Sequence, residues 1–163
     1  MHVKVKITRC TLWLLVIVWA VVIFCFSAQS ATQSSDLSGG FIRRIIEFFY
    51  PGFNLLEQLH QAQIVQGFQF LVRKIAHFSE YAILGFLIMS AFMTHKISTK
   101  QRRRYSVWIG SFYALTDEFH QIFVPGRAMR LYDIAIDVLG VIVGVVIAFL
   151  LGLLIHKFLF RRK

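Results

Sequence analysis

Residues 131–155 read LYDIAIDVLGVIVGVVIAFLLGLLI, and their only charged side chains are those of Asp133 and Asp137. About 20 apolar residues in a helix are enough to cross the hydrocarbon layer of a bilayer. The stretch therefore predicts a transmembrane helix. Its first turns carry two acids, and acids inside membrane segments are rare and commonly functional.

Three further apolar runs predict transmembrane helices at residues 10–27, 75–93 and 105–124. The first run follows basic residues, a pattern that a cleaved signal peptide would share. Its apolar core exceeds the roughly 7–15 residues of a signal peptide core, which favours an uncleaved helix. The prediction is an all-α protein with one domain over residues 1–163, a polytopic membrane bundle of four transmembrane helices.

The segment 28–73, between the first two predicted spans, is too polar to cross a membrane. Residues 28–40 are small and polar and predict a loop. Residues 41–49 place apolar side chains at helical spacing, and Pro51-Gly52 ends that pattern. Asn54 with Glu57 resembles a capping box before a second amphipathic stretch, residues 55–72. We expect this outer loop to form one or two interfacial amphipathic helices.

Composition and charge also indicate a membrane protein. Of the 163 residues 57% are hydrophobic, and the formal net charge is +10. In a soluble protein such a charge would point to nucleic acid, but here the basic residues flank the apolar runs. We therefore expect membrane lipid, and no nucleic acid, as a partner. Cys10 and Cys25 lie in one apolar run, which argues against a disulfide between them.

The basic residues also predict the orientation in the membrane. If the N-terminus is cytoplasmic, twelve Lys and Arg residues fall on the inner side and six on the outer side. Cytoplasmic segments of membrane proteins carry the excess of basic residues. We therefore expect both termini in the cytoplasm.

Acids from three predicted spans share one depth near the outer face. Glu80, Asp117 and Asp137 each lie six or seven residues from the outer end of their span, which is ~9–10 Å at ~1.5 Å per residue. Asp137 also shares a helix face with Gly140 and Gly144, a small-residue pattern that lets a neighbouring helix approach closely. The polar faces are therefore expected to point into the bundle. The candidate residues are His77, Glu80, Asp117, Glu118, His120, Gln121, Asp133 and Asp137, with a basic rim of Arg73, Lys74, Arg127 and Arg130.

Several roles remain open for these residues. Ion pairs that only join helices are the plainest role. In an intramembrane enzyme, a histidine oriented by a carboxylate would act as general base, and the catalytic candidates are His77, Glu80, Asp117, Glu118 and His120. Imidazole and carboxylate groups also suit a divalent metal, although the spacing matches no recognised metalloprotease motif. The basic rim suits a phosphate or carboxylate ligand, and the ligand-binding candidates are Arg73, Lys74, Gln121, Arg127, Arg130, Asp133 and Asp137.

Two long motifs resemble those of the VanZ-like membrane protein family. The first is residues 73–81, RKIAHFSEY, followed by Leu84-Gly85. The second starts with residues 116–121, TDEFHQ, and continues with residues 124–127, VPGR. Ser27-Ala28-Gln29 resembles the family's Ser-Ser-Gln, with Ala28 as a departure. The resemblance selects Lys74, His77, Glu80, Asp117, Glu118, His120, Gln121, Arg127, Asp133 and Asp137.

The resemblance implies a multi-pass protein of the bacterial cell membrane, in a family whose namesake is associated with reduced susceptibility to teicoplanin. We therefore expect an outward-facing site for a lipid-linked cell-wall precursor or a lipoglycopeptide, and a contribution to glycopeptide resistance. The alternative is an intramembrane hydrolase or transferase that acts on a lipid-linked envelope substrate. A proton-coupled carrier fits less well, because the acids all lie in the outer half of the spans.

Overall fold

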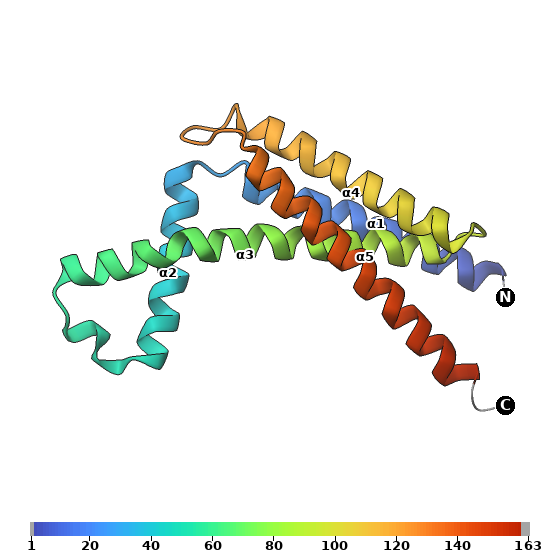
Figure 1. Cartoon of the computed structure of the whole chain (residues 1–163), viewed down its shortest axis with the longest axis horizontal. Coiled ribbons are helices and arrows are strands. Elements are labelled where there is room, and N and C mark those ends of the chain that lie inside the picture. The colour runs from blue at the N-terminus through green and yellow to red at the C-terminus, as the bar shows by residue number, and fades with distance from the viewer. Residues whose placement is uncertain (1, 161–163) are drawn as a thin grey trace.

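The computed structural model describes residues 2–160 and the side chains of residues 6–158, and over this range it contains helices and turns without strands (Figure 1). The predicted all-α class is confirmed. Of the basic side chains counted for orientation, those of Lys4, Arg161, Arg162 and Lys163 lie outside this description. The elements are α1 (His2–Ser27), α2 (Ala31–Phe49), the 3-10 helix η1 (Pro51–Leu55), α3 (Gln58–Met93), α4 (Thr99–Gln121) and α5 (Leu131–Phe160).

Three helices of the described chain are long and apolar enough to cross a membrane. They are Lys6–Ser27 within α1, Gln58–Met93, which is α3, and Leu131–Phe158 within α5. The predicted span 105–124 lies mainly in α4, which is long enough at 23 residues. It is not among the three, because basic residues at its start and acids near its end make it more polar.

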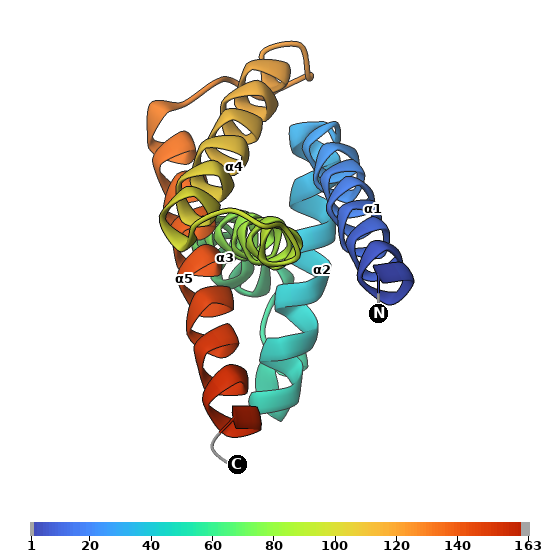
Figure 2. The same ribbon diagram turned by 90° about the vertical axis from the view of Figure 1, so that its right-hand side faces the viewer.

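The helices form a bundle with two distinct ends. The start of α1, the turn from α3 to α4 and the end of α5 lie toward the right in Figure 1. The end of α1 and the connection from α4 to α5 lie at the opposite end. α4 packs on the first half of α5, where Gly110 meets the side chain of Val141, while α5 diverges from α4 toward its C-terminal end (Figures 1 and 2).

Close backbone contact joins α3 to α5. A Cβ at Gly144 would collide with the carbonyl oxygen of Ala82, and one at Gly140 with that of Phe78. Only a residue without a side chain allows the two backbones to approach so closely. The packing role predicted for this glycine pair is thereby confirmed.

Polar contacts fix α1 to the bundle. The indole of Trp19 donates to the carbonyl oxygen of Glu80 at 2.9 Å, and the hydroxyl of Tyr113 donates to that of Ala20 at 2.6 Å. Ile23 and Ser27 of α1 are buried. The first helix is therefore part of the core.

The prediction of a loop over residues 28–40 is wrong, because α2 already begins at Ala31. Ser30 caps it: its hydroxyl accepts from the backbone N–H of Gln33 at 3.3 Å, and the Gln33 side chain accepts from the backbone N–H of Ser30 at 3.1 Å. This reciprocal capping box satisfies two backbone groups and starts a helix through small residues. The end of α2 at Phe49, before Pro51, agrees with the prediction.

The amphipathic stretch 55–72 is not a separate helix. It is continuous with the predicted span 75–93, because no proline interrupts α3 between Gln58 and Met93. The Asn54–Glu57 capping box is also wrong: Asn54 belongs to η1, and Glu57 caps α3 without a side-chain hydrogen bond. At ~1.5 Å per residue the 36 residues of α3 span ~54 Å, more than the ~30 Å hydrocarbon layer. Figure 1 shows its first turns extending past the bundle.

The helix α2 crosses the projecting part of α3 (Figures 1 and 2). Gly39 is buried at the crossing, where a Cβ would lie 3.0 Å from Nε2 of Gln69 and 3.6 Å from Cγ1 of Val65. The Gln69 amide donates to the carbonyl oxygen of Ser35 at 3.1 Å. The crossing places α2 between the end of the bundle and the first turns of α3.

Candidate functional site

Polar side chains from α3, α4 and α5 gather at the end of the bundle where α1 finishes. Two contacts join α3 to α5: Lys74 forms an ion pair with Asp133, and one turn deeper His77 Nδ1 lies 3.7 Å from Asp137 Oδ1. Asp137 is fully buried. His77 follows Lys74 by three residues on α3, and Asp137 follows Asp133 by four on α5, which is about one helical turn in each case. The two contacts therefore lie one above the other.

The acids of α4 complete this cluster. Glu118 is fully buried, and its Oε2 accepts from the backbone N–H of Arg130 at 3.0 Å, which folds the following connection back onto α4. Asp117 is also buried. The hydroxyl groups of Ser27 and Tyr81 lie beside the Asp117 carboxylate, and their oxygen atoms are buried with it.

Ser27 and Tyr81 also belong to this cluster, although neither was among the candidate residues predicted from the sequence. Both stand inside the quoted motifs, so the motifs contained the signal. Their hydroxyl groups come from α1 and α3, and only the packing of these two helices brings them to an acid of α4.

His120 lies away from the α3–α5 contacts. Its ring packs on that of Phe24 of α1, with the ring centroids 4.6 Å apart. It shares a helix face with Asp117, as predicted, but lines neither of the two cavities described next. The structure therefore places this catalytic candidate in the contact between α1 and α4.

A polar cavity of about 290 Å³ opens at this end of the bundle, and we call it the charged cavity. Four cations of the predicted rim line it, together with an imidazole, three glutamine amides and a carboxylate. The predicted residues in its wall are Arg73, Lys74, His77, Gln121, Arg127, Arg130 and Asp133. More than half of the residues selected from the sequence therefore share one cavity.

The turn that carries Arg127 is fastened to the start of α2. Arg127 Nε donates to the carbonyl oxygen of Gln29 at 2.8 Å, and the backbone N–H of Ala31 donates to Pro125 at 3.1 Å. Gly126 adopts a φ of +74°, in the left-handed region, and a Cβ there would lie 2.9 Å from that of Ala31. The Pro-Gly-Arg sequence thus provides a turn that only glycine fits, and this turn positions a guanidinium.

Arg127 and Arg73 form a pair of like charges. Burial, and after it the nearby positive charge of Arg73, lowers the pKa of Arg127 from its usual value. The acids of the cluster act on Arg127 in the opposite direction and offset part of this effect. Within the described chain, Arg73 Nε is buried without a hydrogen-bond partner. Two neighbouring guanidinium groups repel each other, and an anion between them would relieve the repulsion.

A second cavity of about 420 Å³, the apolar groove, adjoins the first and shares Arg73, His77 and Arg127 with it. Its outer wall is formed by exposed apolar side chains of α1 and α2, namely Phe26, Leu37 and Phe41. Glu80, Asp117 and Ser27 also line it. The apolar groove therefore leads from the apolar exterior to the acids of the cluster.

The metal hypothesis gains no support from the geometry. Among the described residues, no three or more His, Cys, Asp or Glu side chains are arranged to hold a metal ion. His77 contacts Asp137 of α5, whereas His120 packs on α1, so the two histidines do not converge.

Three membrane-capable helices packed around buried ionisable residues define a multi-helix membrane protein. The family model described as VanZ/LLP1 matches residues 12–152. The chain therefore belongs to the VanZ/LLP1 family, which confirms the resemblance of its motifs. Comparisons with curated proteins and with solved structures found no match.

Proposed function

We propose that the protein binds the anionic group of a lipid-linked cell-wall precursor or lipoglycopeptide at the outer face of the bacterial cell membrane. In this way it contributes to glycopeptide resistance of the teicoplanin type. The observation that carries the proposal is the pairing of Arg73 with Arg127 in the wall shared by the charged cavity and the apolar groove. A paired guanidinium site suits a phosphate or carboxylate, and the adjoining groove suits an apolar chain.

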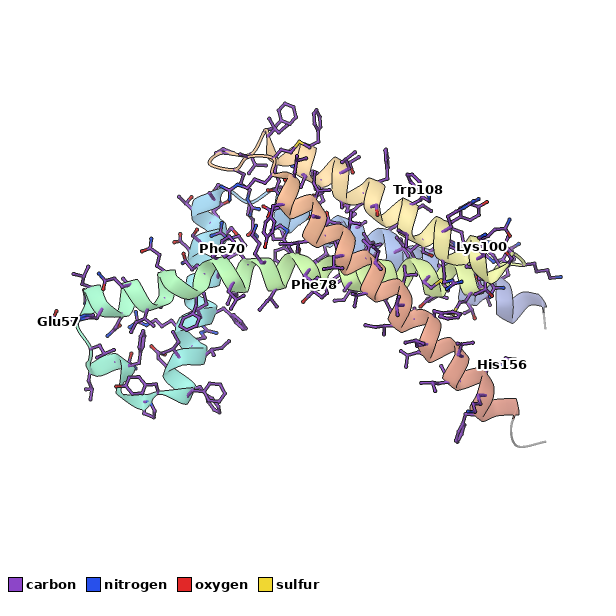
Figure 3. The ribbon with its side chains drawn as sticks, viewed as in Figure 1. Glu57, Phe70, Phe78, Lys100, Trp108 and His156 are labelled. Atoms are coloured by element: carbon purple, nitrogen blue, oxygen red, sulfur yellow. The ribbon has the colours of Figure 1, made fainter. Side chains whose placement is uncertain are left out.

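The proposal includes four transmembrane helices in one domain. α4 packs on α3 and α5, both of which are membrane-capable. Large apolar side chains of α4 face outward: Trp108 is 70% exposed and points away from the bundle (Figure 3). In a bilayer such side chains would contact lipid. The burial of Ile23 and Ser27 supports an uncleaved α1.

The proposed orientation has both termini in the cytoplasm. The start of α1, the basic turn around residues 96–104 and the end of α5 share one end of the bundle (Figure 1). The excess of basic residues at that end supports a cytoplasmic location. The site then faces outward. α2, with exposed Phe41, Ile45 and Phe48, would lie in the outer interface.

Binding of dodecyl phosphate to the purified protein in phosphatidylcholine nanodiscs tests this function. Arg73→Gln and Arg127→Gln should each weaken binding at least roughly tenfold, because charge-assisted hydrogen bonds contribute about 1.5–3 kcal/mol each. Lys100→Gln is the control, since Lys100 lies at the opposite end of α4 (Figure 3). Equal binding by all four proteins would disprove the proposed site.

Susceptibility to teicoplanin tests the cellular part. Cells that lack the protein should become more susceptible, and a gene encoding Arg127→Gln should not restore the original level, whereas Lys100→Gln should. Unchanged susceptibility in cells without the protein would contradict a role in resistance.

The second candidate is an intramembrane enzyme. It is favoured by His77, which lines both cavities while its Nδ1 lies 3.7 Å from the buried Asp137 carboxylate. A histidine oriented by a carboxylate is the arrangement of a general base. Asp137→Asn would then abolish turnover of a lipid-linked substrate while leaving dodecyl phosphate binding intact. Parallel loss of binding and folding would instead indicate a structural role.

A further inference from the structure

We infer that the ligand has three parts in series: an apolar chain, an anionic group, and a neutral glycosyl group that lies furthest from the membrane. The inference rests on the proposed function and adds the form of the ligand. It derives from three cavities that follow one another along α3, each with a different chemistry.

The α3 residues that line the three cavities form three overlapping ranges, which follow one another along the helix. The α3 residues that line the apolar groove lie between Val72 and Glu80, and those that line the charged cavity lie between Gln66 and His77. A third cavity, the amide cavity, takes residues between Gln58 and Gln69. Since α3 is one continuous helix, this sequence order is also a spatial order from the bundle outward.

The amide cavity lies between α2, η1 and the first turns of α3, and its volume is about 750 Å³. This volume falls within the range of about 300–1,000 Å³ typical of small-molecule sites. Its polar wall residues include Ser35, Asp36, Asn54, Gln58, Gln61 and Gln69. Amide and hydroxyl groups both donate and accept hydrogen bonds, as sugar hydroxyls require.

The cation in this wall is already paired. Arg43 donates to Glu47 at 2.9 Å and to the side chain of Gln61 at 2.7 Å. The charged cavity differs, because there Arg73 Nε has no partner among the described residues. The remaining charged residue of the amide cavity wall is the carboxylate of Asp36, which would repel an anion and can accept from hydroxyl groups. The amide cavity therefore suits an uncharged, hydroxyl-rich group, and the charged cavity suits an anionic one.

Neighbouring cavities share wall residues, so they lie side by side along α3. The apolar groove and the charged cavity share Arg73, His77 and Arg127, and the charged and amide cavities share Gln69. α2 separates the apolar groove from the amide cavity: Leu37 and Phe41 line the apolar groove, whereas Gly39 and Gly40 line the amide cavity. An amphiphile that passes the end of α2 would place its chain and its glycosyl group on opposite sides of this helix.

Three probes of increasing complexity test the inference in phosphatidylcholine nanodiscs. They are inorganic phosphate, dodecyl phosphate, and dodecyl phosphate esterified with a hexose. Dodecyl phosphate should bind at least roughly tenfold tighter than inorganic phosphate, because its chain partitions into the bilayer and can enter the apolar groove from there. The hexose should add roughly fivefold, as expected of one or two further hydrogen bonds.

Paired variants assign each gain to a cavity. Asn54→Ala with Gln58→Ala should remove the gain from the hexose while leaving dodecyl phosphate binding unchanged. Leu37→Ser with Phe41→Ser should weaken both dodecyl probes and not inorganic phosphate. Gln63→Ala and Ile45→Ser are the matched controls, because Gln63 and Ile45 are exposed and line none of the three cavities.

The outcomes separate the inference from the function on which it rests. If inorganic phosphate and dodecyl phosphate bind with equal affinity and the hexose adds nothing, the three-part ligand is wrong while the anion site stands. If no probe binds, the proposed function fails as well. A gain from the hexose that survives Asn54→Ala with Gln58→Ala would overturn the assignment of the amide cavity.

Discussion

The two halves of α3 have opposite surroundings. In the second half Tyr81, Leu84 and Ile88 are at most 1% exposed, and the backbone touches that of α5 through glycine. In the first half Leu59 is 70% and Phe70 59% exposed, and α2 crosses this part of the helix. The comparison shows that the candidate residues of α3, which run from Arg73 to Glu80, stand where one environment changes to the other.

The largest expected effect on stability comes from a change in the packed second half of α3. Gly144→Ala should lower the free energy of unfolding by about 3 kcal/mol, because the new methyl group would meet the carbonyl oxygen of Ala82, which belongs to the rigid backbone. Gly152→Ala is the control: its methyl group would meet the flexible end of Met93 at 2.9 Å and should cost under about 1 kcal/mol. Thermal unfolding in detergent measures both. Equal effects would show that the close contact with α5 does not stabilise this half.

The next effect concerns the boundary between the halves. Lys74→Ala should destabilise the fold by about 2–3 kcal/mol, because it leaves Asp133 without its partner at a site where both side chains are only 13–14% exposed. Replacing both residues, Lys74→Met with Asp133→Leu, should recover most of the loss.

Glu47→Ala provides the contrast at the surface. Its partner Arg43 is 51% exposed, so the change should cost only about 0–1 kcal/mol. Comparable losses from Lys74→Ala and Glu47→Ala would contradict the difference in burial between the two pairs.

A smaller effect tests the exposed half. Gly40→Ala should stabilise α2 by up to about 1 kcal/mol, because a Cβ there meets nothing within 4 Å and alanine favours the helix. Gly39→Ala should lose that gain, since its methyl group would press on Gln69 at 3.0 Å. Hydrogen exchange of the α2 amides distinguishes the two. Identical protection in both variants would mean that α2 does not rest on α3 at Gly39.

The smallest effect lies in the turn that follows the packed half. Burial, then the charges of Arg9 and Arg102, lowers the pKa of His95 from its usual value of 6.5, and its Nε2 accepts from the indole of Trp13 at 3.1 Å. The folded chain thus favours the neutral ring. Its contribution to stability is complete above the unfolded pKa and is lost as the pH falls through the lowered folded pKa.

We therefore expect a small decrease in the melting temperature between pH 7 and pH 5, which His95→Gln should reduce. If His95→Gln and the wild type lose stability in parallel, the Trp13–His95 contact is not the cause.

Length and hydropathy were enough to predict the spans in α1 and α5, because an apolar run of that length has few alternatives. Predictions from local sequence patterns were wrong for parts of the outer segment, residues 28–73. Ser, Gly and Gln around residues 30–40 indicate a loop on average, and only the capping box at Ser30 starts the helix. α3 was predicted as two elements because its composition changes, yet backbone hydrogen bonding continues through the change.

The depth and spacing of the acids predicted much of the cluster. The sequence could not place His120, because spacing defines its helix face but not the position of Phe24 on another helix. It could not reveal the amide cavity either, whose walls come from α2, η1 and α3 together. Such features arise from tertiary packing, and no local pattern encodes them.

The unbroken course of α3 has a mechanical consequence. α3 contains no proline to kink it, so a tilt at one end is expected to move the other end as well. α3 contacts α5 at Gly140 and Gly144. The amide cavity lies toward one end of α3 from this contact, and the turn at residues 94–98 lies at the other end. We therefore expect a displacement of the outer end of α3 to be accompanied by an opposite displacement of its other end.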